Sequence, residues 1–316
     1  MRVLANDGIP EDIKHNLETF GFEVKEVRVA HEQLVAYTQK NEIDILLIQQ
    51  GTLLTKRMID ELNHLKAIVF AGVTVNLESI DHIKSNGISV IWAEEALANA
   101  TAEMVLAHLF SGARLLQEAN RNMPLEGDTM FKSLQQSYSS GVELSGKTLG
   151  IIGMNLAGQL LAQKALGLGM HVVYSDSATP KVKAAFELPN GLVFPIDLEA
   201  IPLSELAAQA HFISIHTKYF QRYVVNKDTF EQAVNLIGIV NCAYPEAINE
   251  VDLVDEVNKE TILFAGLDRF EEEPHPAIQV LMQPAFSLSP NIGTATHESQ
   301  HDIWSEIQNK MRELLN

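Results

Sequence analysis

A glycine-bounded turn is the first candidate site for chemistry in this chain. Residues 146–158 combine an apolar run, a turn at Gly153 and a helix start that reaches Gly158. A dinucleotide-binding unit has the same order of strand, turn and helix, because N–H groups at the helix start hold a pyrophosphate. Asp176, at the end of the next expected strand, is placed to accept hydrogen bonds from ribose hydroxyls. The segment therefore predicts a Rossmann-type unit.

The same residues have a purely structural interpretation. A glycine turn can serve only to let a helix pack on a sheet, and Asp176 can simply cap the helix that follows it. Asn155 stands where a middle glycine would let the backbone approach a pyrophosphate. We therefore expect the binding of a dinucleotide to be weakened.

The elements that must position this turn alternate between strands and helices. The first series of expected strands is residues 2–5, 23–29, 45–48, 67–70 and 88–92. The second series is residues 148–152, 171–175, 212–215, 236–241, 262–266 and 285–289, with helices between them. Strands separated by helices of this length favour parallel sheets with right-handed crossovers. The fold class is therefore predicted to be α/β.

The two series are joined by a segment of different character. Residues 98–117 have apolar side chains at helical spacing and are expected to form a helix that links two domains. Residues 120–145 lack a sustained period and are expected to wander over the surface. A final helix is expected to carry Ile303, Ile307 and Met311 on one face.

Composition limits the possible partners. The 316 residues are 46% hydrophobic, which is enough for a large core and suits roughly two domains. The 23 basic and 41 acidic side chains give a net charge of −18, which repels nucleic acid and anionic membranes. Cys242 is the single cysteine, so an intrachain disulfide is excluded. Since neither a signal peptide nor a membrane span is recognisable, we expect a cytoplasmic protein.

Several motifs resemble one known family. They are residues 122–129, residues 143–150, Gly266-Leu267-Asp268, Glu273-Pro274 and Ile292-Gly293. With the glycine turn, they make nearly the whole chain similar to D-2-hydroxyacid dehydrogenases, and most similar to short bacterial 3-phosphoglycerate dehydrogenases. The resemblance implies an NAD-dependent oxidoreductase that forms a homodimer through its cofactor domain. We expect no appended regulatory domain.

The resemblance also implies a domain arrangement and a set of binding residues. A Rossmann-type NAD domain, residues 98–284, is inserted in a flavodoxin-like substrate domain made of residues 1–97 and 285–316; both are doubly wound parallel sheets. The implied cofactor-binding residues are Gly153, Asn155, Leu156, Ala157, Gly158, Asp176, His216, Thr217, Ala243 and Asp268. The implied substrate-binding residues are Gln49, Gly72, Val73 and Asn76.

The catalytic positions of the family are only partly kept. In the family an Arg binds the substrate carboxylate, a His exchanges the hydroxyl proton and a Glu orients the His. Here these positions hold Tyr244, Asn291 and Glu273, respectively. Asparagine cannot act as a base near neutral pH, and loss of a general base costs roughly 10² to 10⁴ in rate. We therefore predict weak or absent dehydrogenase activity on 2-hydroxy or 2-oxo acids.

Two other functions stay open. The chain is an active oxidoreductase on an altered substrate if Tyr244 serves as proton donor, which requires a cation such as Lys218 or Arg269 beside it. Glu273 has two equally good interpretations: an acid/base group, or a structural carboxylate in the turn before Pro274. Alternatively, the chain is a non-enzymatic subunit that pairs with an active paralogue.

Two further features are given structural interpretations. The run from His297 to His301 matches a His-Glu-x-x-His zinc pattern but lacks a third ligand, so no metal site is expected. Cys242 is interpreted as a small buried hydrophobic residue, because no His or Arg adjoins it in the sequence.

Overall fold

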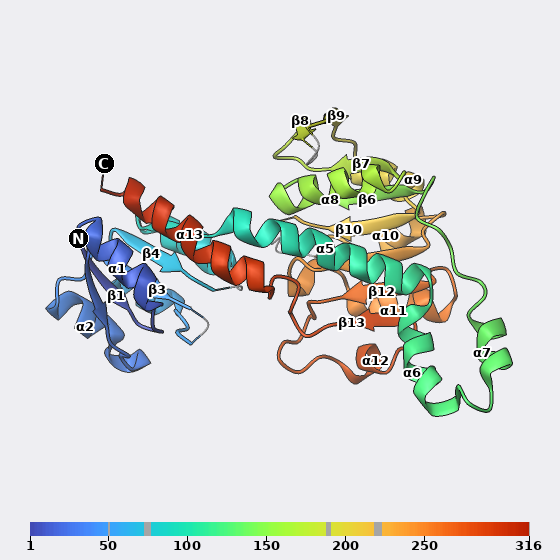
Figure 1. The fold of residues 1–316 in the computed structure, drawn as a ribbon, viewed down its shortest axis with the longest axis horizontal. Coiled ribbons are helices and arrows are strands. Elements are labelled where there is room, and N and C mark those ends of the chain that lie inside the picture. Colours follow the sequence, from blue (N-terminus) through green and yellow to red (C-terminus); the bar gives the residue numbers. More distant parts are fainter. Residues whose placement is uncertain (50, 73–76, 188–190, 218–222, 316) are drawn as a thin grey trace. The chain divides into compact units, whose positions relative to one another are not determined.

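The protein, as a computed structural model, forms two compact units. The structure describes residues 1–49, 51–72, 77–187, 191–217 and 223–315. The first unit comprises Met1–Leu97 and Ala295–Asn316, and the second comprises Ala98–Thr294 (Figure 1). Each is built on a parallel sheet, which confirms the predicted α/β class.

The first unit has a five-stranded parallel sheet in the order β2-β1-β3-β4-β5. Its strands are β1 (Arg2–Ala5), β2 (Glu23–Glu26), β3 (Ile45–Ile48), β4 (Ala67–Phe70) and β5 (Ser89–Trp92). Its helices are α1 (Glu11–Thr19), the 3-10 turn η1 (His31–Gln33), α2 (Leu34–Lys40), α3 (Lys56–Glu61), α4 (Leu77–Ser85) and α13 (His297–Glu313). This strand order is that of flavodoxin-like folds.

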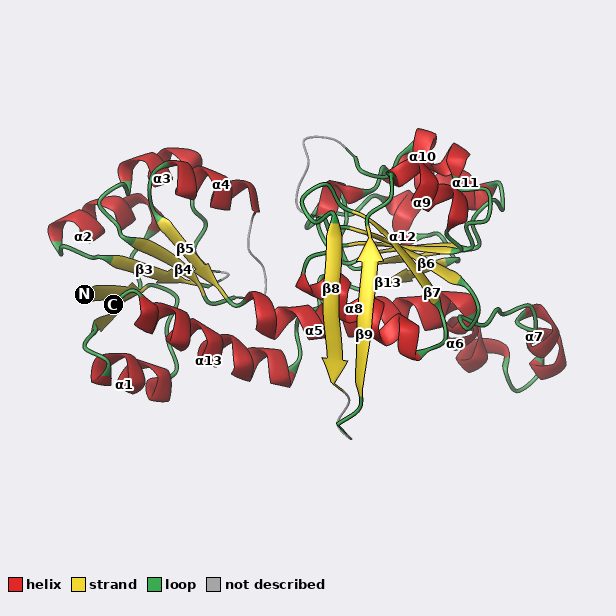
Figure 2. Cartoon of the chain, turned by 90° about the horizontal axis from the view of Figure 1, so that it is seen from above, coloured by secondary structure: helices red, strands yellow, loops and turns green. Residues whose placement is uncertain are grey.

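Helices cover both faces of this sheet. Figure 2 shows α1 and α13 on one face and α2, α3 and α4 on the other. Because successive side chains of a strand point to opposite faces, Val3 packs in the cluster with α1 and α13, whereas Leu4 packs in the cluster with α2 and α3. Both faces are apolar, so β3 is a continuous buried run with no polar alternation.

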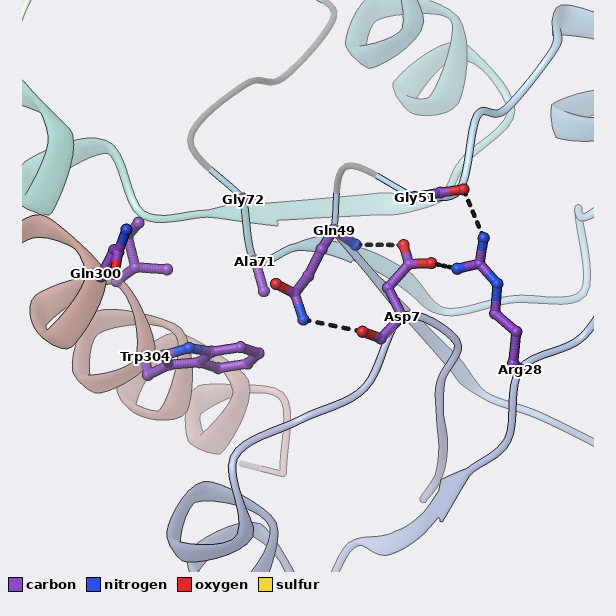
Figure 3. Close-up of a pocket in the computed structure, with 9 residues that line it drawn as sticks. Asp7, Arg28, Gln49, Gly51, Ala71, Gly72, Gln300 and Trp304 are labelled. Atoms are coloured by element: carbon purple, nitrogen blue, oxygen red, sulfur yellow. Dashed lines mark hydrogen bonds and ion pairs between the residues drawn. The ribbon is translucent and has the colours of Figure 1, made fainter. Parts of the chain in front are cut away.

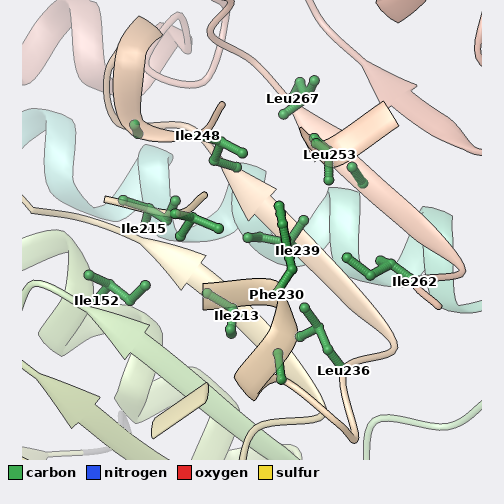
Figure 4. Close-up of a cluster of buried hydrophobic side chains, with 14 of the residues drawn as sticks. Ile152, Ile213, Ile215, Phe230, Leu236, Ile239, Ile248, Leu253, Ile262 and Leu267 are labelled. Carbon is green, nitrogen blue, oxygen red and sulfur yellow. The ribbon is translucent and has the colours of Figure 1, made fainter. Parts of the chain in front are cut away.

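The second unit has a six-stranded parallel sheet in the order β13-β12-β11-β10-β6-β7. The strands are β6 (Thr148–Ile152), β7 (His171–Ser175), β10 (Phe212–Ile215), β11 (Gly238–Asn241), β12 (Phe264–Leu267) and β13 (Phe286–Leu288). One face is covered by α5 (Glu94–Ala113) and α8 (Leu156–Gly167). The other is covered by α9 (Leu203–Gln209), α10 (Lys227–Gln232), α11 (Glu250–Asn258) and α12 (Ile278–Leu281). Figure 4 shows the hydrophobic core between the sheet and this second group of helices, where Ile213 and Ile239 pack in one cluster with Phe230 and Leu253.

The boundary between the units differs from the predicted one. The sequence placed residues 285–316 in the first domain and ended the second at residue 284. In the structure β13 pairs with β12, with Ala265 opposite Phe286, and therefore completes the sheet of the second unit. The chain returns to the first unit only at Ala295.

Residues 120–145 were expected to wander over the surface, and that expectation was wrong. They contribute to α6 (Leu116–Glu126) and form α7 (Phe131–Ser137). Pro124 lies inside α6, two residues before the helix ends. It has no N–H to donate to the carbonyl oxygen of residue 120, so α6 lacks that hydrogen bond close to its end.

The connection from β7 to β10 was expected to be helical, and most of it is not. An antiparallel hairpin of β8 (Lys181–Glu187) and β9 (Val193–Glu199) precedes the short α9 (Figure 2). Residues 181–184 and 196–199 alternate polar and apolar side chains, and the residues between the strands include the pair Asn190-Gly191. These are hairpin signals that the sequence contained, and Gly191 has a positive φ of +81°.

Across the described ranges, none of the helices has the length and apolar character needed to cross a membrane.

Candidate functional site

The carboxyl ends of the strands in the second unit bring the predicted residues to one edge. Parallel strands all end at the same edge of a sheet, so the loops after β6, β7 and β10 gather there. The glycine turn follows β6, Asp176 follows β7, and His216 follows β10. Successive strands are added on one side of β6 and then on the other, so the order reverses between β6 and β10. In open α/β sheets, ligands bind at such a reversal.

The loops after the remaining three strands carry the predicted catalytic positions. Tyr244 follows β11, Glu273 follows β12 and Asn291 follows β13. These strands are neighbours in the sheet, so all three positions lie at the edge that holds the glycine turn. The edge therefore has one half with the predicted cofactor-binding residues, at β6, β7 and β10, which we call the cofactor half, and another half with the predicted catalytic positions.

Glycine is required at two positions of the turn. Gly153 has a φ of +92°, and a Cβ there would collide with the backbone of Thr217. A Cβ at Gly158 would lie 2.6 Å from the carbonyl oxygen of Gly153. The turn thus approaches the end of β10 closely, and the start of α8 approaches the turn closely. This is the packing that a dinucleotide-binding unit uses.

Asn155 takes part in the turn through its side chain. It is the N-cap of α8, and its Oδ1 accepts a hydrogen bond of 3.0 Å from the N–H of Gly158. Its Nδ2 donates to the carbonyl oxygen of His216 at 2.7 Å. Leu156 and Ala157 form the first turn of α8 directly behind it. One N–H at the helix start is therefore already satisfied, where a pyrophosphate would compete for it.

Asp176 does not cap a helix, because the hairpin of β8 and β9 follows β7, and that suggested use was wrong. Its Oδ1 accepts from the N–H of Ala178 and its Oδ2 accepts from the N–H of Met154, each at 2.8 Å. The second bond fastens the end of β7 to the glycine turn. An ionised carboxylate has about four acceptor sites, so these two bonds leave capacity for ribose hydroxyls.

His216 is a buried, neutral imidazole. Its ring Nε2 lies 2.8 Å from the hydroxyl oxygen of Ser214, and only 2% of the residue is exposed. Burial lowers the pKa of His216 to about 4, because the charged form would lose its hydration. This residue therefore supports the β10 end of the turn without adding positive charge at neutral pH.

The loop with Asn291 is held by the buried carboxylate of Asp268. Its Oδ1 accepts from the hydroxyl of Ser289 at 2.5 Å and from the N–H of Ile292 at 2.9 Å, and its Oδ2 accepts from the N–H of Gly293 at 2.7 Å. Asn291 has a φ of +53°, a left-handed conformation that asparagine tolerates better than most residues. The position of residue 291 is thus set by Asp268.

His108 joins this network and was missed in the sequence. Its imidazole lies on α5 between the hydroxyls of Ser287, at 2.9 Å, and Ser289, at 3.0 Å. Burial lowers the pKa of His108, and the nearby charge of Asp268 opposes that shift. The available signal was a histidine in the otherwise apolar run of residues 104–110, because a buried histidine requires polar partners.

Glu273 is paired with an arginine. The Nε of Arg269 donates to Oε1 at 2.8 Å and its Nη2 donates to Oε2 at 3.1 Å. The Nη1 of the same guanidinium lies 3.4 Å from the carbonyl oxygen of Ala243. Arg269, which was weighed as a cation for Tyr244, thus contacts Glu273 and Ala243. Tyr244 itself is buried.

Among the described residues, neither Cys242 nor the His-Glu-x-x-His run has surroundings that suit a chemical role. Burial and the charge of Asp268 raise the pKa of Cys242, which favours the unreactive thiol. His297 and His301 are both exposed on α13. Over the described residues, no group of three or more His, Cys, Asp or Glu side chains is arranged to hold a metal ion.

The first unit has a cavity of about 540 Å³ at the carboxyl edge of its sheet (Figure 3). Gln49, after β3, and Gly72, after β4, line it, as do residues of α13. The other two predicted substrate-binding positions, Val73 and Asn76, lie outside the described residues, as does Lys218.

Comparisons with known proteins agree with this architecture. Residues 106–293 match the family model of the D-isomer specific 2-hydroxyacid dehydrogenase NAD binding domain. A hydroxypyruvate reductase of Thermotoga maritima is 30% identical over 276 residues, which cover 85% of this chain and 84% of that protein. A D-3-phosphoglycerate dehydrogenase of Methanocaldococcus jannaschii is 29% identical over 100% of this chain, which spans only 57% of that protein.

A crystal structure of a glyoxylate reductase from Paecilomyes thermophila has a similar fold. The TM-score is 0.82 at 22% identity, over 100% of this chain and 95% of that chain. At this identity, the likeness shows a shared fold.

We predict that His216 makes the chain less stable in acid. The unfolded state takes up a proton near the ordinary pKa of 6.5, whereas the folded state does so only near 4, so stability is lost as the pH falls between these values. The loss from pH 7 to pH 5 is about 2 kcal/mol for this group. Urea unfolding of His216→Gln should show a pH dependence smaller by that amount.

The matched control is His301→Gln, whose side chain is 83% exposed and should leave the pH dependence unchanged. A His216→Gln variant with the pH dependence of the parent would contradict the prediction.

We also predict that Asn155→Gly tightens the binding of NAD and NADH several-fold. The change frees the N–H of Gly158 and removes side-chain bulk, while glycine at an N-cap costs only a few tenths of a kcal/mol. Titration calorimetry measures the effect. Asn249→Gly is the control, since Asn249 is an N-cap of the same type on α11, away from the turn. Unchanged or weaker binding in Asn155→Gly would argue against obstruction by Asn155.

Proposed function

Because the chain belongs to the D-isomer specific 2-hydroxyacid dehydrogenase family, whose NAD-binding domain it carries, we propose that it binds NAD and a 2-hydroxy or 2-oxo acid but transfers hydride slowly or not at all. The observation that carries the proposal is the pairing of Glu273 with Arg269 while position 291 holds an asparagine. On this proposal, residue 291 supplies no proton-transferring group, and the carboxylate of Glu273 is not free to orient one.

The chemistry of each substitution supports slow turnover. An amide neither accepts nor returns a proton near neutral pH, so Asn291 cannot replace an imidazole base. Tyr244 is a neutral phenol at the position of a guanidinium, and a planar guanidinium binds a carboxylate through two charge-assisted hydrogen bonds. Losses of groups that act together are not additive, so the combined penalty is less than the product of the two.

The cofactor half supports binding better than the other half supports catalysis. Gly153 and Gly158 have the close packing of a dinucleotide turn, and Asp176 retains acceptor capacity for a ribose. NAD, when bound, would supply the hydride acceptor. The carboxylate of Asp176 also favours NAD over NADP, because it would repel a 2′-phosphate.

A second candidate function is a working oxidoreductase on an altered 2-oxo acid. The guanidinium of Arg269 favours it, because this cation reaches the carbonyl of Ala243, the residue next to Tyr244. In that case Tyr244 or Glu273 takes part in the proton step. Arg269 already has a carboxylate partner, which is why we rank this function second.

We further propose that the chain forms a homodimer through its NAD-binding unit. The segment of α6 and α7 exposes large apolar side chains, and burial of such side chains drives association. Leu125 is 77% exposed and Phe131 is 56% exposed. A mixed dimer with an active paralogue would use the same segment.

Light scattering should give twice the mass of one chain, and Phe131→Glu should shift it towards a single chain. Val234→Glu is the control, because Val234 is 78% exposed in the same unit but outside this segment. A monomeric parent protein would refute the homodimer, and co-purification with a paralogue would replace it with the mixed dimer.

The proposed function predicts slow oxidation of NADH with glyoxylate, hydroxypyruvate or 3-phosphohydroxypyruvate. We expect the double variant Asn291→His, Tyr244→Arg to raise kcat/KM by roughly 10², because it restores a base and a carboxylate clamp. Asn235→His adds an imidazole at an exposed position and should leave the rate unchanged. A parent protein that turns over at the 1 to 10³ s⁻¹ common for enzymes would refute the proposal.

The same assay separates the second candidate. Activity that is present in the parent and lost in Tyr244→Phe or Glu273→Gln would favour an altered oxidoreductase. Activity that persists in both variants would exclude those roles.

A further inference from the structure

We propose that the cavity of the first unit binds an uncharged chain that bears several hydroxyl groups, such as the polyol part of a sugar acid. The cavity lies at the carboxyl ends of β1, β3 and β4, and Asp7, Gln49 and Ala71 line it from the loops that follow these strands (Figure 3). Trp304 closes it from α13. The proposal rests on the proposed function in one respect, that the ligand is a 2-hydroxy or 2-oxo acid.

The described lining of the cavity has no net charge. Arg28 is its only Lys or Arg, and its guanidinium forms an ion pair with the carboxylate of Asp7. The Nη2 of Arg28 also donates to the carbonyl oxygen of Gly51 at 2.8 Å. A phosphate group carries nearly two negative charges and binds where several cationic donors converge. The cavity therefore disfavours a phosphorylated ligand.

The carboxylate of Asp7 is fixed, so it cannot easily release Arg28. Only 5% of its side chain is exposed. Its Oδ2 accepts from the backbone N–H of Gln49 at 2.7 Å, and its Oδ1 accepts from the hydroxyl of Thr52 at 2.8 Å. Gly51 leaves room for the pair, since a Cβ there would lie 2.8 Å from Oδ1 of Asp7. The neutral ion pair is thus part of the framework of the cavity.

Two amides supply the remaining polar groups. The Nε2 of Gln49 donates to the carbonyl oxygens of Gly8, at 3.1 Å, and Asp7, at 3.3 Å, while its Oε1 accepts no hydrogen bond from the residues that the structure describes. Gln300 is exposed at the rim, and its amide likewise has no side-chain hydrogen bond to a described residue. Each hydroxyl group both donates and accepts, so a polyol can bond the free oxygen of Gln49 and both ends of the Gln300 amide.

Trp304 favours a ligand with an apolar face. Its ring is half-buried and points into the cavity opposite Gln49 (Figure 3). The C–H groups of a hydroxylated carbon chain can pack on that ring while the hydroxyls turn towards the amides. An aromatic ligand would use the ring equally well, but it would leave the free amide groups of Gln49 and Gln300 without partners, which costs binding free energy.

Binding can be measured without any turnover. The three probes would be D-gluconate for the polyol, D-3-phosphoglycerate for the phosphate and D-phenyllactate for the aromatic ligand. Titration calorimetry on the full chain would measure the affinity for each. We expect D-gluconate to bind at least tenfold tighter than the other two. Tighter binding of either alternative, or no measurable binding of D-gluconate, would overturn the proposal.

Tryptophan fluorescence can test whether the ligand binds in this cavity. The chain has two tryptophans, Trp92 and Trp304, so Trp92→Phe leaves Trp304 as the only reporter. D-gluconate should change this emission with the same saturation as in calorimetry. Emission that stays constant while calorimetry shows binding would place the ligand elsewhere and contradict the proposed site.

A charge added to the cavity provides the sharper test. Gln49→Arg should tighten D-3-phosphoglycerate at least tenfold and weaken D-gluconate, because it adds an unpaired cation and removes the free amide oxygen. Gln39→Arg is the control, because this variant adds the same charge outside the cavity. Gln39 is exposed on α2, the helix that precedes β3 and leads into the end of that strand opposite the cavity. Equal effects of the two variants would mean that overall charge, and not the cavity, sets the preference.

These outcomes are independent of the proposed function. Fast NADH oxidation together with preferred D-gluconate binding would refute slow turnover and support the cavity assignment. Slow turnover without D-gluconate binding would support the proposed function and refute the cavity assignment.

Discussion

The carboxylate of Asp268 determines where the loop after β13 can lie. It is almost fully buried, and a buried charge is tolerated only when hydrogen bonds replace its lost hydration. Ser289, Ile292 and Gly293 supply those bonds. Gly293 must lack a side chain, because a Cβ would lie 2.7 Å from Oδ2 of Asp268. The place of residue 291 is therefore fixed by its neighbours.

The cofactor half of the edge depends on backbone contacts in a similar way. The turn at Gly153 fits against Thr217 only without a Cβ, and Asn155 then links the turn to the carbonyl of His216. Asp176 adds a bond from the neighbouring strand to the N–H of Met154. The turn is thus rigid before any cofactor binds. Rigidity favours binding by lowering the entropy cost, whereas the bond from Asn155 to Gly158 opposes it.

Local patterns in the sequence were enough to predict the strands but not the polar network. β1, β3, β4, β6, β7 and β10 have the expected bounds, because a buried parallel strand is a continuous apolar run that depends little on context. The hairpin of β8 and β9 was missed although its alternation and its Asn-Gly pair were visible. The partners of His108 lie 179 and 181 residues away, so spacing along the chain could not reveal them. The pairing of Arg269 with Glu273, four residues apart in a loop, also required coordinates.

That ion pair also balances charge at this edge of the sheet. A partly buried glutamate without a partner would be an uncompensated negative charge, which is costly in a chain that already carries a charge of −18. Arg269 compensates Glu273 with two hydrogen bonds and covers the carbonyl of Ala243 with a third contact. Both oxygens of the Glu273 carboxylate are therefore paired, and the ion pair ties the loop after β12 to the loop after β11.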